Sequence, residues 1–266
     1  MGGRMNRENP AERTALHHTQ GTGIERIAYP IGIRTTTVAA LEYVTPYMLR
    51  VTLEGPGLDG FHTYQFDDHV RVIFPDPDGT LRLPVPNEHL MLNWPHPPPR
   101  SRKYTVRRYA GRELDLDFVI HPGGLASTWA VQLQPGDEVA IAGPPGAKSF
   151  PQTYAHYLFA VDTTALPAAA RWLEESSDDV SADLVIEHDH PEEPAYPLAK
   201  RADVTITWVP RGQLAPAVQQ LRADPSTFLF AAGEADSIKP LRPWSKPRLP
   251  HLFTGYWKQG QTDHDE

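Results

Sequence analysis

The sequence predicts a two-domain β + α/β protein, with an N-terminal six-stranded antiparallel β-barrel followed by an open parallel α/β sheet. Two observations support this. Up to about Ser149, short segments rich in Val, Thr, Tyr and Phe are separated by Gly, Pro and Asp. Beyond it, apolar strands alternate with helical segments, as in a parallel sheet. We expect a flexible tail at 1–23, the barrel at 24–148, the α/β domain at 149–260 and a C-terminal tail at 261–266.

The predicted barrel strands follow from segments of strand length with turn residues between them. They are 36–44, 48–53, 69–74, 103–109, 114–120 and 138–141. The proline-rich stretch 84–99 is expected to be an irregular surface loop, and a short helix is expected at about 127–133.

The predicted parallel strands are continuous apolar runs, typical of strands buried on both faces. They are 157–161, 182–187, 204–209, 228–232 and 252–257, with helices at 165–175, 214–221 and from about 237. A barrel beside such a sheet can bring two redox groups together, but this architecture does not name a substrate.

Composition excludes several classes of function. The 266 residues include no cysteine, which excludes disulfides, thiolate nucleophiles and cysteine-ligated iron–sulfur clusters. A formal net charge of −8 argues against nucleic acid as a partner. Apolar runs are too short to cross a bilayer and the polar N-terminus does not resemble a signal peptide, so we expect a cytoplasmic protein with no membrane insertion. We expect no metal site, because no ligand spacing occurs.

The segment Arg100 to Arg108 combines five basic residues with a tyrosine and a threonine. Strand alternation puts Arg102, Tyr104 and Val106 on one face, and Lys103, Thr105 and Arg107 on the other. An arginine beside a flat ring suits a phosphate and a planar heterocycle, and Thr105 could bond to a ring nitrogen. A basic, solvated edge strand explains the segment equally well.

A second segment, His121 to Ala130, places two glycines before a helix start. Glycines there let backbone N–H groups approach an anion, and the helix dipole adds to the attraction. Alone, the segment is better explained by an ordinary helix cap. Together, the two segments offer contacts for a ring and then for a pyrophosphate, which points to a flavin dinucleotide.

With these motifs the chain resembles the siderophore-interacting protein family of the ferredoxin-reductase-like superfamily. The resemblance covers about residues 24–260. Its segments are RKYTVR (102–107), DFVIH (117–121), GLASTWA (124–130), PGDEVAIAGPPG (135–146), TALPAAARWLE (164–174), AAGE (231–234) and GYWKQG (255–260).

This resemblance implies a flavin-dependent ferric-siderophore reductase with noncovalent FAD, which releases iron as Fe(II). NADH, NADPH or a ferredoxin would supply the electrons. The implied cofactor-binding residues are Arg102, Tyr104, Thr105, Val106, His121, Gly124, Ala126 and Ser127 in the first domain, and Thr164, Ala165, Gly233, Glu234 and Trp257 in the second. Because many ferric siderophores are anionic, we expect a basic rim for the substrate, formed by Arg107, Lys239, Arg242 and Lys258.

Two departures from the family pattern concern the cofactor turns. Val161-Asp162-Thr163-Thr164 stands where relatives more often have glycine first and an acidic residue third, and the helix start at Gly124 lacks the commoner proline and arginine. Two other functions stay open: a general NAD(P)H:flavin or ferredoxin-type reductase that serves a protein partner, and a non-catalytic siderophore or flavin carrier. The choice between NADH and NADPH also stays open, because Glu187 could oppose a 2′-phosphate while His188, His190 and Arg211 could hold one.

Overall fold

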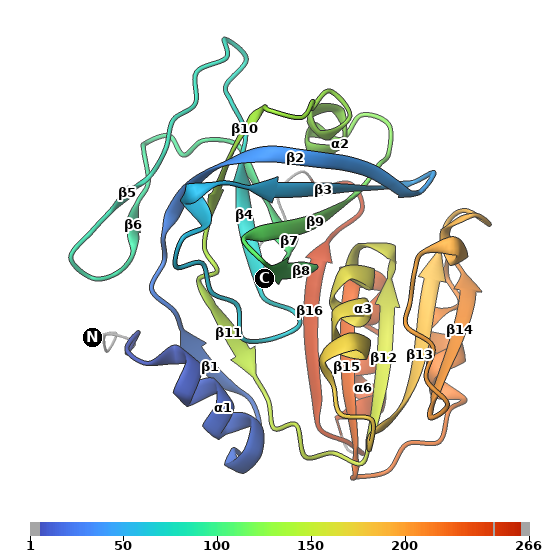
Figure 1. Ribbon diagram of the computed structural model, residues 1–266. Coiled ribbons are helices and arrows are strands. Elements are labelled where there is room, and N and C mark those ends of the chain that lie inside the picture. Colours follow the sequence, from blue (N-terminus) through green and yellow to red (C-terminus); the bar gives the residue numbers. More distant parts are fainter. Residues whose placement is uncertain (1–5, 247, 262–266) are drawn as a thin grey trace. The chain divides into compact units, whose positions relative to one another are not determined.

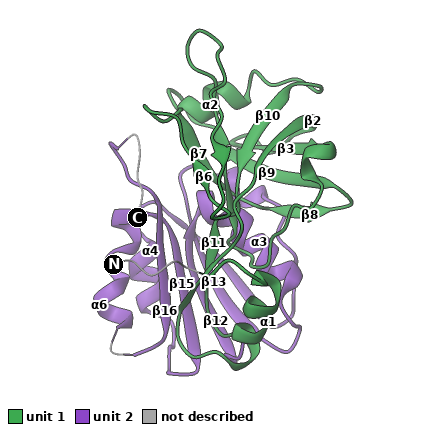
Figure 2. Ribbon diagram, turned by 90° about the vertical axis from the view of Figure 1, so that its left-hand side faces the viewer, with its two compact units in different colours: residues 1–151 green, residues 152–266 purple. Residues whose placement is uncertain are grey.

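The computed structural model describes residues 6–246 and 248–261. The chain divides into two compact units, Met1–Pro151 and Gln152–Glu266 (Figure 2). The division therefore falls three residues beyond the boundary expected after residue 148. Among the described residues, no helix is long and apolar enough to cross a membrane.

The N-terminal unit is built on a seven-stranded antiparallel sheet with the order β7-β4-β10-β2-β3-β9-β8 (Figure 1). Its strands are β2 (Ile33–Thr45), β3 (Met48–Glu54), β4 (His69–Ile73), β7 (Ser101–Thr105), β8 (Arg108–Ala110), β9 (Glu113–Val119) and β10 (Glu138–Ala142).

The predicted count of six strands is wrong because the single strand expected at 103–109 divides into β7 and β8. The N–H of Val106 donates to Asp68 beside β4, whereas the N–H of Arg107 donates to Asp115 of β9. The chain thus changes its partner strand between two consecutive residues. Because β7 and β8 stand at opposite ends of the strand order, this segment links the two edges of the sheet.

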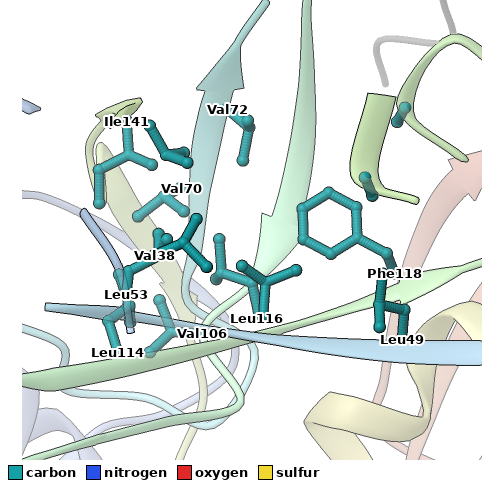
Figure 3. Close-up of a cluster of buried hydrophobic side chains, with 14 of the residues drawn as sticks. Val38, Leu49, Leu53, Val70, Val72, Val106, Leu114, Leu116, Phe118 and Ile141 are labelled. Carbon is teal, nitrogen blue, oxygen red and sulfur yellow. The ribbon is translucent and has the colours of Figure 1, made fainter. Parts of the chain in front are cut away.

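The core of this unit lies on one face of the sheet, to which alternate side chains of the strands contribute. Figure 3 shows ten of its side chains, contributed mainly by β2, β3, β4, β9 and β10: Val38, Leu49, Leu53, Val70, Val72, Val106, Leu114, Leu116, Phe118 and Ile141. Each such side chain contributes about 1.5–3 kcal/mol when fully buried.

Shorter elements surround this sheet. They are α1 (Pro10–Gln20), β1 (Glu25–Ala28), which pairs with β11 (Gly146–Ser149), the 3-10 turn η1 (Pro56–Leu58), the hairpin of β5 (Val85–Pro86) and β6 (Leu92–Asn93), and α2 (Leu125–Ala130).

Two of these elements differ from expectation. Residues 10–20, expected within a flexible tail, form α1, and Arg7 just before it donates to the carbonyl of Tyr29 at 2.5 Å. Polar residues conceal this helix in the sequence, although His17 is only 4% exposed. The loop 84–99 is not wholly irregular, because Asn87 accepts the N–H groups of His89 and Met91 and shapes a hairpin.

The C-terminal unit is a five-stranded parallel sheet with the order β14-β13-β12-β15-β16. Its strands are β12 (His156–Asp162), β13 (Ser181–His188), β14 (Val204–Pro210), β15 (Thr227–Glu234) and β16 (His251–Trp257). The remaining elements are η2 (Thr163–Ala165), α3 (Leu166–Glu175), η3 (Glu193–Ala195), α4 (Leu214–Gln219), α5 (Ala235–Ile238) and α6 (Leu241–Ser245).

This sheet confirms the predicted parallel α/β architecture. The strand order runs outward from β12 to β14 on one side and from β15 to β16 on the other. The topological switch therefore lies between β12 and β15. In open α/β sheets, ligands bind outside the carboxyl ends of the strands at such a point.

Candidate functional site

Strand β7 carries Arg102 and Tyr104 on the same side of the N-terminal sheet. The Tyr104 ring lies against Phe118, with 4.0 Å between the ring centroids, and packs against the core cluster that contains Val106. Burial raises the pKa of the Tyr104 phenol, which therefore stays neutral. Arg102 is half-buried and donates to the carbonyl of Ser101 at 2.7 Å. The strand thus presents a neutral aromatic ring and a guanidinium two residues apart.

The other face of this segment is less exposed than expected. Lys103 is exposed, but Thr105 and Arg107 are only 7% and 6% exposed. Arg107 was expected on a basic rim in contact with substrate. Arg107 is buried instead, at the point where the chain changes its partner from the β4 side to β9. Its own N–H is bonded to Asp115 of β9, and the N–H of Val106 is bonded to Asp68 beside β4. Arg107 therefore does not belong to a solvent-facing rim.

The turn before α2 holds the second group of predicted residues. Gly123 has a φ of +78°, which a residue with a side chain rarely adopts. At Gly124, an added Cβ would lie 2.5 Å from the ring of the exposed His121, so that side chain would have to move. The Ser127 hydroxyl accepts from the N–H of His121 and donates to Val119, and so fixes the turn to the end of β9.

This turn leaves backbone donors at the start of α2. The first intrahelical bond of the helix runs from Thr128 to the carbonyl of Gly124 at 2.9 Å. The N–H groups of the residues before Thr128, Ala126 among them, are those that a helix start leaves without an intrahelical acceptor. With the ring of Tyr104 and the guanidinium of Arg102 on β7, these donors fit a flavin dinucleotide: a surface for the ring system, a cation, and amides for phosphate.

The carboxyl edge of the parallel sheet is organised around Asp162, the last residue of β12. Its carboxylate accepts from both the N–H and the hydroxyl of Thr164, from the N–H of Glu234 at 2.8 Å and from Nε1 of Trp257 at 2.8 Å. Burial raises the pKa of Asp162, against the lowering effect of these hydrogen bonds. One carboxylate thus connects the ends of β12, β15 and β16.

Gly233 is required by this arrangement. Its φ is +140°, and an added Cβ would lie 2.5 Å from Cγ of Asp162. The register between β15 and β16 also shifts between Gly233 and Glu234. The Glu234 carboxylate then accepts from the N–H groups of Ser237 and Gln259 and fixes the segments after both strands.

The structure therefore brings Thr164, Gly233, Glu234 and Trp257 together, as expected for a site at the switch point. Ala165 lies in the same turn with its side chain fully buried, so only its backbone can face a ligand. Asp162 already engages the amides of Thr164 and Glu234, so a dinucleotide phosphate has to use other donors along this edge.

Three further cations were expected to contact substrate. Lys239 is exposed at the end of α5. The guanidinium of Arg242 lies 4.7 Å from the ring centroid of Phe253. Lys258, directly after β16, lies 3.5 Å from the carboxylate of Asp236. All three thus follow β15 or β16 in the chain.

The ends of β13 and β14 form a second polar cluster. Glu187 is 1% exposed and accepts from the N–H groups of Gly212 and Leu214 and from the Ser237 hydroxyl. Arg211 makes a bidentate ion pair with Asp189, which lowers the pKa of that carboxyl.

The sequence did not predict that Asp162 would connect the ends of β12, β15 and β16 through hydrogen bonds. An acidic residue that ends an apolar strand and precedes a threonine turn is a detectable signal, but its partner Trp257 lies 95 positions away. Within residues 6–246 and 248–261, no group of three or more His, Asp or Glu side chains is arranged to hold a metal ion.

Two family models together match about four fifths of the chain. Residues 37–148 match the siderophore-interacting FAD-binding domain, and residues 154–260 match the siderophore-interacting protein domain. These ranges fall within the two compact units and contain β7, the start of α2 and the carboxyl edge of the parallel sheet.

Two relatives with similar sequences are named as ferric reductases. The ferric vibriobactin reductase ViuB of Vibrio cholerae is 32% identical over 91% of this chain and 95% of its own length. The NADPH-dependent ferric-chelate reductase of Escherichia coli is 40% identical over 152 residues, which are 56% of this chain and 59% of that protein.

Solved structures extend the comparison to the fold. A siderophore utilization protein from T. fusca superposes with a TM-score of 0.84 at 34% identity, covering 91% of this chain and 98% of that one. The ferredoxin reductase of carbazole 1,9a-dioxygenase shares only the fold, with a TM-score of 0.62 at 16% identity, over 85% of this chain and 70% of that one. The chain is a member of the siderophore-interacting protein family, with a ferredoxin-reductase-like fold.

Proposed function

We propose that the protein is an FAD-dependent reductase of ferric siderophore complexes that releases iron as Fe(II) in the cytoplasm. The observation that carries this proposal is the pairing, in a FAD-binding domain of the siderophore-interacting family, of the Arg102 and Tyr104 strand with the donor-rich start of α2. The names of the Vibrio cholerae and Escherichia coli relatives, both ferric reductases, support the same substrate class.

Reduction of the metal is sufficient to release it. A siderophore binds Fe(III) through hard oxygen donors and binds Fe(II) far less tightly, because the lower charge weakens each bond. Bound FAD would supply the electron transfer, since it takes electrons in pairs from a donor and passes them singly to the metal. The protein needs no iron ligands of its own for this reaction.

The residues of the N-terminal unit then have distinct tasks. Tyr104 would pack against the isoalloxazine ring, and its neutral phenol adds no charge there. Arg102 and the amides at Gly124 and Ala126 would hold the pyrophosphate, whereas Ser127 and His121 shape the turn that positions those amides. Thr105 would bond near the reactive nitrogen through its backbone, and Val106 would support the ring from the core.

In the C-terminal unit, Thr164, Gly233, Glu234 and Trp257 border the switch point, where NADH or NADPH would donate electrons. Lys239, Arg242 and Lys258 would bind an anionic ferric complex. A ferredoxin as electron donor would use a protein surface instead and would leave the switch point without a ligand.

An anaerobic experiment tests the reductase function. The purified protein, loaded with FAD and reduced by dithionite, is mixed with ferric hydroxamate and ferric catecholate complexes in the presence of an Fe(II) chelator. We expect rapid flavin reoxidation together with formation of the Fe(II)–chelator complex. A flavin that stays reduced beside every complex would instead favour a general electron-transfer reductase, and reoxidation no faster than that of free FAD would favour a carrier.

A further inference from the structure

The cluster after β13 and β14 contains the groups that distinguish NADH from NADPH in dinucleotide-binding sheets. In such sheets, an acidic residue after the second strand binds the ribose 2′-hydroxyl of NADH, and an arginine nearby accommodates the 2′-phosphate of NADPH. This chain has both groups there, Asp189 directly after β13 and Arg211 directly after β14. The contacts of the two side chains show which of them is available.

Glu187 is not available to a ribose. Its carboxylate is 1% exposed and is used by the loop that leads from β14 into α4, through Gly212 at 2.7 Å and Leu214 at 3.4 Å. Its second oxygen accepts from the Ser237 hydroxyl at 3.1 Å. Glu187 therefore fixes the backbone at the carboxyl ends of β13 and β14. Asp189 and Arg211 are then the residues that can distinguish NADH from NADPH.

The side-on donor pair of Arg211 is already occupied. Its Nε and Nη2 both donate to the Asp189 carboxylate, and Nη1 lies 3.7 Å from Glu187. One face of the guanidinium also lies 5.4 Å from the ring centroid of Trp257. A 2′-phosphate binds arginine best through two parallel N–H groups, and the fork of Nε and Nη2 is held by Asp189.

Asp189 itself remains accessible and is held in place. Its side chain is 41% exposed, its N–H donates to Glu193 at 2.8 Å, and the N–H of Arg211 donates to the carbonyl of His188. Glu187 and Asp189 place two carboxyl groups around Arg211, and the imidazoles of His188 and His190 also lie near Asp189. A dianionic phosphate at this position is repelled, whereas a ribose hydroxyl can donate to the open lone pairs of Asp189.

We propose that the carboxyl ends of β13 and β14 bind the adenosine ribose of NADH and discriminate against NADPH, with Asp189 as the specificity-determining residue. This inference rests on the proposed function, because it names the electron donor of that reductase. It distinguishes this chain from the Escherichia coli relative, which is named NADPH-dependent.

Calorimetric binding to the oxidised, FAD-loaded protein tests the inference. We expect the wild type to bind NADH at least about tenfold more tightly than NADPH, and Asp189→Ala to reduce this ratio about tenfold, because Arg211 becomes free to bind the phosphate. The matched control is Asp178→Ala, which removes a 99% exposed carboxylate just before β13, at the opposite edge of the sheet. It should leave the ratio unchanged.

A double variant makes the test sharper. Adding Arg211→Ala to Asp189→Ala should abolish the gain in NADPH affinity, and thermal unfolding of each variant verifies its fold. Tighter wild-type binding of NADPH, an equal ratio in the Asp189 and Asp178 variants, or binding of neither dinucleotide would each overturn the inference. None of these results affects iron release by the dithionite-reduced protein, so a failure of the proposed function is recognised separately.

Discussion

The flavin strand of the N-terminal unit and the carboxyl edge of the C-terminal sheet use their polar groups in opposite ways. On β7 and at the start of α2 lie an aromatic ring, a guanidinium and backbone amides of the kinds that suit a flavin dinucleotide. At the sheet edge, by contrast, Asp162, Glu187, Glu234 and Arg211 are engaged mainly with groups of the same unit. The comparison teaches that the first region offers polar groups that a cofactor could use, whereas the second uses its polar groups to fix its own strand ends.

The largest effect on stability is expected from Asp162→Ala. This variant tests whether hydrogen bonds to Asp162 stabilise the carboxyl edge of the sheet. The substitution leaves the buried N–H of Glu234 and the part-buried donors of Trp257 and Thr164 without their acceptor. We expect a loss of about 3 kcal/mol in the free energy of unfolding, because each unsatisfied buried donor costs roughly 1–3 kcal/mol. Chemical denaturation measures it, and a loss below about 1 kcal/mol would show that the edge does not depend on this residue.

A somewhat smaller effect is expected from Gly233→Ala. The added Cβ meets the Asp162 carboxylate, so we expect a cost of about 2 kcal/mol from overpacking and backbone strain. Because both changes act on one contact, the double variant with Asp162→Ala should be less destabilised than the sum of the two single variants. If the losses in unfolding free energy of the two single variants simply add in the double variant, the close contact between residue 233 and Asp162 is contradicted.

In the flavin region, Tyr104→Ala should weaken FAD binding about tenfold, whereas Tyr104→Phe should retain it. The ring is the part that packs on Phe118, and stacking of aromatic rings contributes about 0.5–1.5 kcal/mol beyond burial. Tyr43→Ala is the control, since Tyr43 is 56% exposed on β2. Fluorescence titration with FAD measures the affinities. An equal loss of FAD affinity in all three variants would show that Tyr104 does not contact the flavin.

The smallest effect concerns pH. The pKa of Asp162 is raised in the folded protein, so the folded state holds this proton more tightly than the unfolded state does. The contribution of Asp162 to stability is therefore largest at low pH and declines as the pH rises from about 3.9 through the raised value. The stability difference between wild type and Asp162→Asn should accordingly shrink as the pH rises above about 3.9, as followed by thermal unfolding. A difference that grows with pH would mean that hydrogen bonds outweigh burial at this carboxyl.

Much of the fold was predictable from local patterns. The apolar runs of β12, β13 and β15 and the alternation along β2, β3 and β9 follow from strand geometry alone, and they appear where expected. The division of the strand at Val106 and Arg107 was not predictable, because it reflects a change of partner strand that only the folded sheet defines. Helix α1 was missed because its sequence is polar.

In the candidate sites, too, local features could be predicted from the sequence, whereas contacts between separate strands could not. Motif spacing predicted a flavin contact on the strand of Arg102 and Tyr104 and at the turn of Gly124, since each motif lies within a short segment of chain. The burial of Arg107, the network around Asp162 and the ion pair between Arg211 and Asp189 all depend on residues from separate strands. Such tertiary contacts leave little trace in a single sequence.

The visible spectrum of two purified arginine variants tests most directly whether the two regions differ as described. We predict that Arg102→Ala loses most of the visible absorbance of bound FAD, because the proposed phosphate contact on β7 is removed. Arg211→Ala should keep the flavin content of the wild type, because Arg211 lies directly after β14, at the edge where a dinucleotide is proposed to bind. Full flavin retention in Arg102→Ala, or loss of flavin from Arg211→Ala, would contradict the account.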